Sequence, residues 1–376
     1  MLTALLLALA FAAAATEVAF RWSWRVPPPF AAVAQPGMFV PTGADEPALQ
    51  AGFRGCSRVG DAVAPVAIGA LGLRGEVPAR RDGQRRVLMV GDGAVFGGGV
   101  EAAHALPARL EAALHAASVD VVVGNGGMPA VGVTHAVARL ARLDAPFQAD
   151  AFVIAAGLGD DVFDELAPSR TVFGGRLLAE PWAEAVRVSW RARLAVRSRA
   201  ALWLELQLGG DRGPPWLAGG VAAVARRLGV PGDGAPDGVW CDALDARTVW
   251  VAGTEPPIPR VLAALDRSLQ RARTAAGSRP VWFVLLPSVW QVDPARRLAR
   301  LRELGLDPVA HAPGLLQRRW AEVAVAAGLV ALDATPMLAA EPDHAGLFLA
   351  DGVHLSARGN EVVGRWLAAE LAAGLR

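Results

Sequence analysis

Residues 87–100 read VLMVGDGAVFGGGV and give the first clear indication of the fold. It starts as an apolar run, passes through a glycine turn and continues as a helical segment. This succession is typical of a buried strand and the helix that follows it in an α/β protein. In an α/β enzyme the turn is the usual place for an exposed nucleophile, but Gly93 stands where a serine would be expected. The stretch therefore predicts an enzyme scaffold and leaves its chemistry in question.

The segments that follow continue the same rhythm. Three apolar runs alternate with two helical segments, at 86–91, 101–117, 119–125, 133–144 and 150–157. After residue 260 the rhythm resumes with two strands and two helices, at 279–288, 315–328, 329–335 and 356–375. Such βαβ alternation predicts a three-layer α/β/α sandwich with a parallel central sheet, as in flavodoxin-like folds.

The remaining segments set the domain organisation. Residues 1–22 are predicted as a signal peptide or N-terminal membrane anchor, and residues 23–84, rich in Pro and Gly, as an extended N-terminal arm with turns. Residues 85–376 form one α/β domain in this interpretation. A long basic helix at 184–207 precedes an irregular insertion at about 208–260, which is rich in Gly, Pro, Asp and Trp.

The N-terminus favours export to the extracytoplasmic side. Its apolar run from Leu2 to Ala15 has the length of a signal-peptide core and is short for a membrane-spanning helix. No Lys or Arg precedes the run, whereas Glu17 and Arg21 follow it, so an uncleaved anchor in the membrane is the alternative.

Composition excludes several classes of protein. The chain has 376 residues, 53% of them hydrophobic and 19% charged, which is enough to bury a large core. Its net charge of +1, without a long basic tract, gives no support to nucleic-acid binding. Cys56 and Cys241 are too few for a disulfide framework and lack metal-ligand spacing, although they could pair in an oxidising compartment.

The sharpest local signal is DGVHLS near the C-terminus, where Asp351 and His354 precede the last helix. A carboxylate three residues before a histidine can orient the imidazole so that its other nitrogen faces a nucleophile. The same pair also fits a simple turn ahead of a helix, because Asp favours turns for its own reasons. The pair needs further support before it indicates catalysis.

That support comes from the order of short motifs, which resembles the SGNH (GDSL-type) hydrolase family over roughly residues 65–376. Four blocks carry the resemblance, and they are GDG (91–93), NGGMPAVG (125–132), GLGD (157–160) and the terminal Asp351-x-x-His354. Two further stretches are also similar to the family, ALGLRG (70–75) and LLPSVWQV (285–292). The resemblance implies the α/β/α fold and a catalytic dyad of Asp351 and His354.

Set against the family pattern, three site positions differ. The nucleophilic Ser is replaced by Gly93, and the two oxyanion-hole positions, a Gly and an Asn in the family, hold Ala130 and Gly159. Gly93 has no side-chain atom that could attack an acyl carbon, so covalent acyl transfer loses its first step. The missing Asn amide removes about 3 kcal/mol of transition-state stabilisation.

These departures predict a catalytically degenerate hydrolase-like protein of the cell envelope that binds an acylated carbohydrate or another small ester ligand. One alternative is an active ester hydrolase or O-acyltransferase, in which His354 activates a water in the room left by the truncation to Gly93, or works with an unidentified nucleophile. Another is a structural component of an envelope assembly, with the insertion as its contact surface.

Other candidate sites are weaker, and no cofactor or metal is expected. The glycine-rich stretch lacks the register of a dinucleotide-binding motif. Asp160, Asp161 and Asp164 fit a solvated loop and helix cap better than a metal site, and Arg74 is a candidate for reaching the cleft. Tryptophans of the insertion and three helical histidines are interpreted as packing or surface residues, namely Trp216, Trp240, Trp250, His104, His115 and His135.

Overall fold

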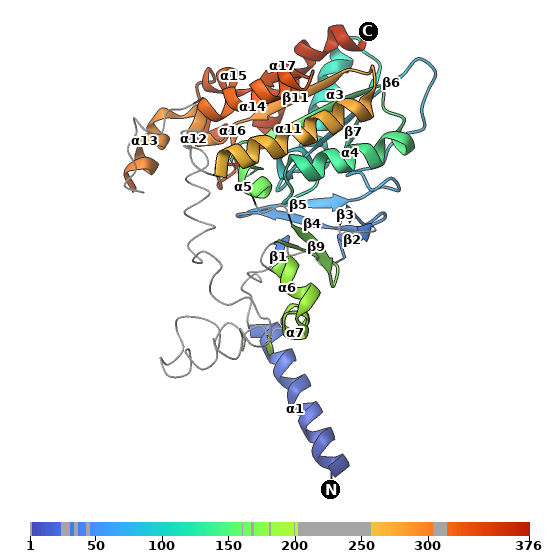
Figure 1. Cartoon of the computed structure of the whole chain (residues 1–376), viewed down its shortest axis with the longest axis vertical. Helices are drawn as coiled ribbons and strands as arrows, with labels where there is room; N and C mark the ends of the chain where they lie inside the picture. Colours follow the sequence, from blue (N-terminus) through green and yellow to red (C-terminus); the bar gives the residue numbers. More distant parts are fainter. Residues whose placement is uncertain are drawn as a thin grey trace. The chain divides into compact units, whose positions relative to one another are not determined.

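The stretch at 87–100 forms strand β6 (Arg85–Gly91) and the short helix α2 (Gly93–Phe96) in the computed structural model (Figure 1). β6 lies inside a five-stranded sheet of order β12–β11–β8–β6–β7, whose neighbouring strands all pair in parallel. The other four strands are β7 (Val121–Asn125), β8 (Ala151–Gly157), β11 (Val281–Leu286) and β12 (Val330–Asp333). Every residue of β7, β8 and β11 is buried, which explains why these strands read as continuous apolar runs.

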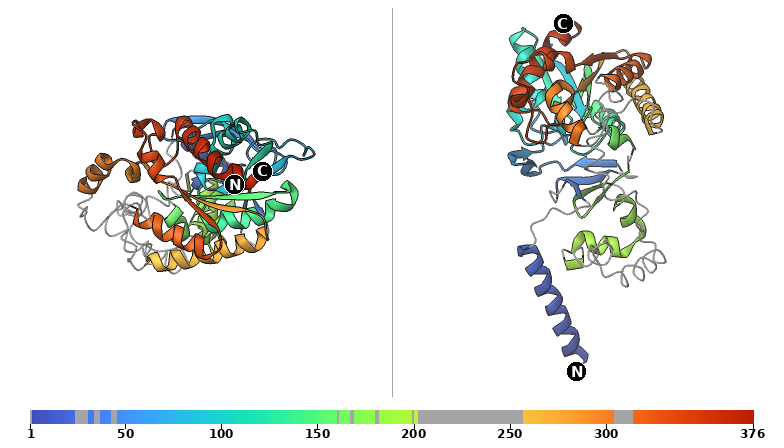
Figure 2. Two further views of the ribbon diagram at one scale, coloured as in Figure 1. Left: turned by 90° about the horizontal axis from the view of Figure 1, so that it is seen from above. Right: turned by 90° about the vertical axis from the view of Figure 1, so that its left-hand side faces the viewer.

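Helices cover both faces of this sheet. One face packs against α4 (Val133–Phe147), α11 (Pro257–Ala276) and α14 (Leu315–Ala326), the other against α3 (Leu106–Ala116) and α17 (Ala357–Leu375). Figure 2 shows the sheet between these two layers in its left-hand view. The predicted three-layer α/β/α sandwich with a parallel central sheet is confirmed.

The structure describes residues 2–23, 31–33, 37–42, 46–159, 161–166, 169–179, 182–198, 200–201, 257–303 and 314–376. The chain divides into two units, Met1–Pro47 with Ser169–Trp240 and Ala48–Pro168 with Cys241–Arg376. The second unit, here the sheet unit, contains the central sheet together with α5 (Asp161–Leu166), α12 (Val289–Val292), α13 (Pro294–Glu303), α15 (Thr335–Ala339) and α16 (His344–Leu347).

The first unit contains α1 (Leu2–Ser23), α6 (Trp182–Val188), α7 (Trp190–Arg197) and a three-stranded antiparallel sheet. The strands of this sheet are β1 (Ala31–Val33), β10 (Arg176–Ala179) and β9 (Arg170–Phe173). Within the described residues, no helix is both long and apolar enough to span a membrane.

The region predicted as an extended arm, 23–84, contains short strands as well as turns. They are β1, β2 (Phe39–Thr42), β3 (Glu46–Leu49), β4 (Arg54–Val59) and β5 (Ala62–Ala67). β4 and β5 form an antiparallel hairpin in the sheet unit, with the exposed Cys56 on β4. Cys241 lies outside the described residues, as does the predicted insertion up to residue 256 with Trp216, Trp240 and Trp250.

The predicted helix at 184–207 is wrong, because α6 and α7 are separate helices. Ser189 interrupts them with an extended backbone, and its hydroxyl accepts a hydrogen bond from the N–H of Ala192 at 3.4 Å. Because Ser189 caps the start of α7, it also ends α6. The spacing of apolar residues alone does not predict such a break.

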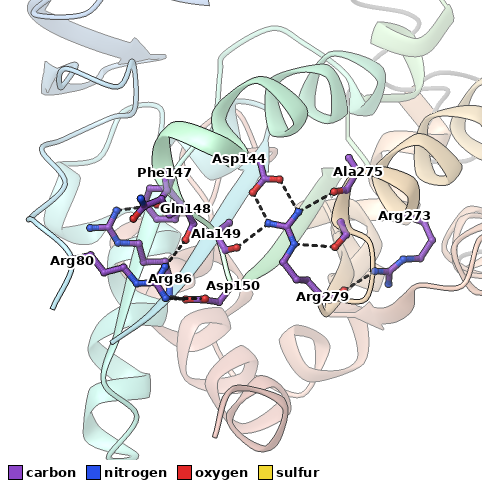
Figure 3. A network of polar contacts seen from close by, with 11 residues as sticks. Arg80, Arg86, Asp144, Phe147, Gln148, Ala149, Asp150, Arg273, Ala275 and Arg279 are labelled. Carbon is purple, nitrogen blue, oxygen red and sulfur yellow. Dashed lines mark hydrogen bonds and ion pairs between the residues drawn. The ribbon is translucent and has the colours of Figure 1, made fainter. Parts of the chain in front are cut away.

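The amino ends of the sheet strands are held by arginine–carboxylate contacts (Figure 3). Arg279, just before β11, makes a bidentate ion pair with Asp144 at 2.6 and 2.7 Å. Asp150, just before β8, accepts hydrogen bonds from Arg80 at 2.8 Å and from the N–H of Arg86 at 2.7 Å. We call this network the amino-end cluster.

Candidate active site

The four family-like blocks meet at the opposite, carboxyl end of the sheet. The first three follow β6, β7 and β8, and Asp351 and His354 lie in the loop before α17. The backbone joins the first two blocks directly, because the N–H of Met128 donates to the carbonyl of Gly91 at 3.0 Å. Ligand sites of α/β sheets form at this end of parallel strands.

Asp351 and His354 form the hydrogen-bonded dyad that the spacing predicts. Nδ1 of His354 lies 2.6 Å from Oδ2 of Asp351, and Oδ1 accepts the N–H groups of Val353 and His354 at 3.1 Å each. Burial works to raise the pKa of Asp351, but the hydrogen bond and charge of His354 and these two N–H groups outweigh it, so the pKa lies below its ordinary value. The side chains are 20% (His354) and 28% (Asp351) exposed, so solvent reaches the dyad.

The imidazole of His354 lies directly against Gly93. A Cβ placed on Gly93 would be 2.6 Å from Nε2 of His354, and the three atoms nearest to it all belong to this ring. The ring also lies near Gly98, where an added Cβ would be 3.3 Å from Cδ2 of His354 and 3.0 Å from Cγ2 of Val59. The ring thus fills the room that truncation to glycine was expected to leave for a water.

Gly159 lies beside the same loop. A Cβ on Gly159 would be 2.9 Å from Cγ1 of Val353 and 3.5 Å from Cβ of Ser288. Val353 therefore takes the space that an asparagine side chain would enter first. The structure brings Gly93 and Gly159 to the dyad loop, as the family pattern implies.

Ala130 lies in the loop between β7 and α4 with φ of 59°, in the left-handed region. This conformation costs an alanine about 1–2 kcal/mol and a glycine almost nothing. The loop thus keeps a backbone suited to the family's glycine after the side chain has changed.

Two buried arginines hold these loops through main-chain carbonyls. Arg74 donates to the carbonyls of Phe96 and Gly97, and to that of Val100 at 2.6 Å. Its guanidinium braces the turn after α2, so the expectation that it reaches the cleft is wrong. Burial lowers its pKa to about 10, which leaves it charged at neutral pH.

Arg139, on α4, holds the second block through main-chain carbonyls in the same way. It was not predicted from the sequence as a residue of the site. Its Nε donates to the carbonyl of Gly126 at 2.6 Å and its Nη2 to that of Gly72. Burial, with a smaller contribution from the charge of Arg142, lowers its pKa to about 9. The only signal in the sequence is an arginine among the apolar positions of an amphipathic helix.

Asp92 is a second carboxylate near the imidazole that the sequence did not single out. It is buried and caps α2, accepting the N–H of Ala94 at 2.9 Å. Burial raises its pKa, while the charge of His354 and the N–H groups of the turn act in the opposite direction.

The remaining candidates that the structure describes make contacts of other kinds. Asp161 is buried and accepts the N–H of Gly157 at 2.7 Å, so its prediction as a solvated residue is wrong, and Asp160 lies outside the described residues. His115 contacts the carbonyl of Val121 at 2.7 Å and His104 the side chain of Arg109, as packing residues do. Within the described residues, no group of three or more His, Cys, Asp or Glu side chains gathers as a metal site.

Comparison with known proteins gives distant structural neighbours. No protein-family model and no curated protein matches the chain. A lipase/acylhydrolase from Enterococcus faecalis is similar with a TM-score of 0.40 and 16% identity over 77% of this chain and 96% of that one. A protein from Desulfitobacterium hafniense described as lipolytic and of the G-D-S-L family has a TM-score of 0.36 and 11% identity over 76% and 99%.

A variant of Axe2, an acetyl-xylooligosaccharide esterase from Geobacillus Stearmophilus, has a TM-score of 0.37 and 12% identity over 76% and 94%. These neighbours bear names from the lipase, acylhydrolase and esterase group that the sequence motifs resemble. Their identities lie below 25% and their TM-scores below 0.5, so this likeness does not define the chemistry of the chain. That chemistry has to follow from the geometry of its own site.

The nucleophile position beside the dyad carries no reactive side chain. The dyad can orient the imidazole, but the turn at 91–100 contains no Ser, Thr or Cys. Because Gly93 has no side-chain atom, an acyl group has no point of attachment at this position.

Proposed function

We propose that this chain is a catalytically inactive, SGNH hydrolase-like protein of the cell envelope that binds an acylated ligand. The contact between the His354 imidazole and Gly93 carries the proposal, because the ring stands where the side chain of a nucleophile would begin. Loss of a triad nucleophile alone costs about a million-fold in rate in a serine protease. The absence of a side-chain amide at Gly159 lowers the expected rate further.

Ligand binding is supported by what surrounds the dyad. The partly exposed imidazole offers a polar group, and the partly exposed side chains of Val59, Leu349 and Val353 border it. A partly exposed polar dyad beside apolar side chains suits an ester or acetylated sugar. Binding would need neither a hydroxyl at Gly93 nor an amide at Gly159.

The envelope location is proposed because the apolar N-terminus is typical of an export segment. This segment is either removed after export or retained. Retention is supported by Glu17 in α1, whose carboxylate accepts hydrogen bonds from the hydroxyl of Ser198 at 2.7 Å and the N–H of Ala200 at 3.0 Å.

The test is an ester-hydrolysis assay of the purified full chain with a short-chain aryl acetate and an acetylated glycan. We expect no turnover above that of the His354→Ala variant. Binding of the acetylated glycan, measured by calorimetry, should weaken in the same variant. Turnover that His354→Ala abolishes would refute the inactive assignment.

A second test is the variant Gly93→Ser. Its Cβ needs the space now taken by Nε2 of His354, and Gly159 still lacks an amide worth about 3 kcal/mol. We therefore expect little activity from Gly93→Ser, and more when Gly159→Asn is added together with Val353→Ala, which clears the space for the asparagine side chain. Strong activity from the single variant would show that the amide is dispensable.

One alternative function is favoured by a specific observation. The intact, solvent-accessible dyad suits an ester hydrolase or O-acyltransferase in which His354 activates a water, once the ring moves away from Gly93. The aryl acetate assay separates this alternative from the inactive one. A structural role in an envelope assembly predicts co-purification of a partner without glycan binding.

A further inference from the structure

Helices α6 and α7 of the first unit form a corner with a core of small side chains. The residues buried in this core are Leu178, Ala183, Ala185, Val186, Ala192, Ala195 and Val196. Nε of Arg193, on α7, donates to the carbonyl of Val186 on α6 at 2.6 Å and so fixes the corner. The two helices therefore present a defined outer surface.

Large apolar side chains lie on this outer surface rather than in the core. Val188 is 78% exposed, Trp190 68% and Leu194 48%. Trp190 and Leu194 are four residues apart on α7, so they lie on one face of the helix. A cluster of exposed apolar side chains that includes a tryptophan indicates a binding surface.

The same segment is strongly basic. Residues 182–197 contain four arginines and one glutamate. Arg187, Arg193 and Arg197 are exposed beside the apolar residues. A partner for this surface must accept apolar side chains and carry negative charge.

The surface is linked to the apolar N-terminal helix. Glu17 of α1 hydrogen-bonds to Ser198, the residue that follows α7. α1 itself exposes Leu7, Phe11 and Trp22. Two elements of one unit that are joined by a hydrogen bond thus both expose large apolar side chains.

We propose that the outer face of α6 and α7, formed by Val188, Trp190, Leu194 and the flanking arginines, docks on the surface of an anionic lipid bilayer. Tryptophan prefers the membrane interface, where the indole ring meets acyl chains and its N–H stays in polar surroundings. The exposed arginines also make contacts within the unit, but their positive charges lie at this surface and add an attraction that depends on anionic lipid and on salt. This inference does not depend on what the dyad site binds.

The test uses the full chain with Cys56→Ser and Cys241→Ser and one environment-sensitive thiol dye. The dye is placed at Trp190→Cys or, as a matched control, at Val325→Cys, which is 63% exposed on α14 of the sheet unit. Vesicles contain phosphatidylcholine with or without phosphatidylglycerol, with brominated lipid as quencher. Because α1 can hold the chain on both vesicle types, the dye reports the position of α7 itself.

We expect the Trp190→Cys dye to shift its emission to the blue and to be quenched on anionic vesicles. Both effects should shrink without phosphatidylglycerol and in 1 M salt, where the Debye length is about 3 Å. The Val325→Cys dye should stay unchanged. A dye at Leu194→Cys, with circular dichroism as the folding control, repeats the measurement if Trp190→Cys misfolds.

Equal responses of the α7 and α14 dyes would overturn the proposal, as would a response without lipid specificity. A blue shift that grows with protein concentration in the absence of vesicles would assign the surface to a second copy of the chain instead.

Discussion

The two ends of the central sheet use arginine in different ways. At the amino end, Arg279 and Arg80 pair with the carboxylates of Asp144 and Asp150 (Figure 3). At the carboxyl end, the partners of Arg74 and Arg139 described by the structure are main-chain carbonyls of the loops that bear the family-like motifs.

The difference explains how a site can keep its shape when its side chains change. Carbonyl acceptors belong to the backbone, so they remain whatever side chain occupies position 93, 130 or 159. The loops around the dyad are therefore held independently of a nucleophile. The amino-end cluster combines carbonyl contacts of Arg279 and Arg86 with ion pairs that depend on the carboxylates of Asp144 and Asp150.

The largest expected effect comes from removing a carbonyl-bound arginine. Arg74→Met leaves the buried carbonyls of Phe96, Gly97 and Val100 without this donor, at a cost of about 3 kcal/mol in the free energy of unfolding. The matched change at the amino end, Arg279→Met, removes a partly exposed ion pair together with hydrogen bonds to three carbonyls, and should cost about 2 kcal/mol. Urea unfolding of both variants measures the contrast.

The two substitutions should also differ in how their cost depends on salt concentration. Salt screens the partly exposed amino-end pair more than a buried guanidinium, so the cost of Arg279→Met should fall in 1 M NaCl while that of Arg74→Met stays the same. A larger effect at the amino end, or equal salt dependence, would contradict the distinction between the two ends.

The contact between Gly93 and His354 predicts an energetic coupling. Gly93→Ala forces the imidazole to move, since its Cβ would lie 2.6 Å from Nε2, whereas in a His354→Ala background the methyl group meets no ring. A double-mutant cycle should give a coupling of about 1–2 kcal/mol. Additive effects would mean that the ring does not rest on Gly93 in solution.

The smallest effect concerns pH. Because the folded pKa of Asp351 is lowered, its ionised form stabilises the fold above the unfolded value of about 3.9, and this contribution is lost as the pH falls through the folded pKa. Below pH 4 the wild type should therefore lose up to about 1 kcal/mol more stability than Asp351→Asn. Urea unfolding between pH 2 and 7 measures the difference, and parallel curves would exclude it.

The fold and the members of the dyad could be predicted because both depend on local patterns. Apolar runs separated by helical segments specify the parallel sheet, and a spacing of three residues brings Asp351 to His354. The approach of Gly93 to the dyad followed from the family's order of motifs.

What could not be predicted depends on contacts between distant segments. The position of the imidazole involves Gly98 and Val59, which come from a loop and a hairpin far from residue 354 in sequence. Arg139 is a charged residue on an otherwise apolar helix face. Its role follows only from its acceptors, the carbonyls of Gly126 and Gly72, which lie far from it in the sequence. The break at Ser189 was missed because serine is compatible with a helix interior and also caps a new one.

Ala130 has a consequence for the energy of the whole fold. A residue held in a backbone conformation that opposes its own preference can persist only where surrounding contacts outweigh the strain. The β7–α4 loop thus stores free energy even in the absence of a ligand, and the rest of the sheet unit must supply the rigidity that keeps it from relaxing.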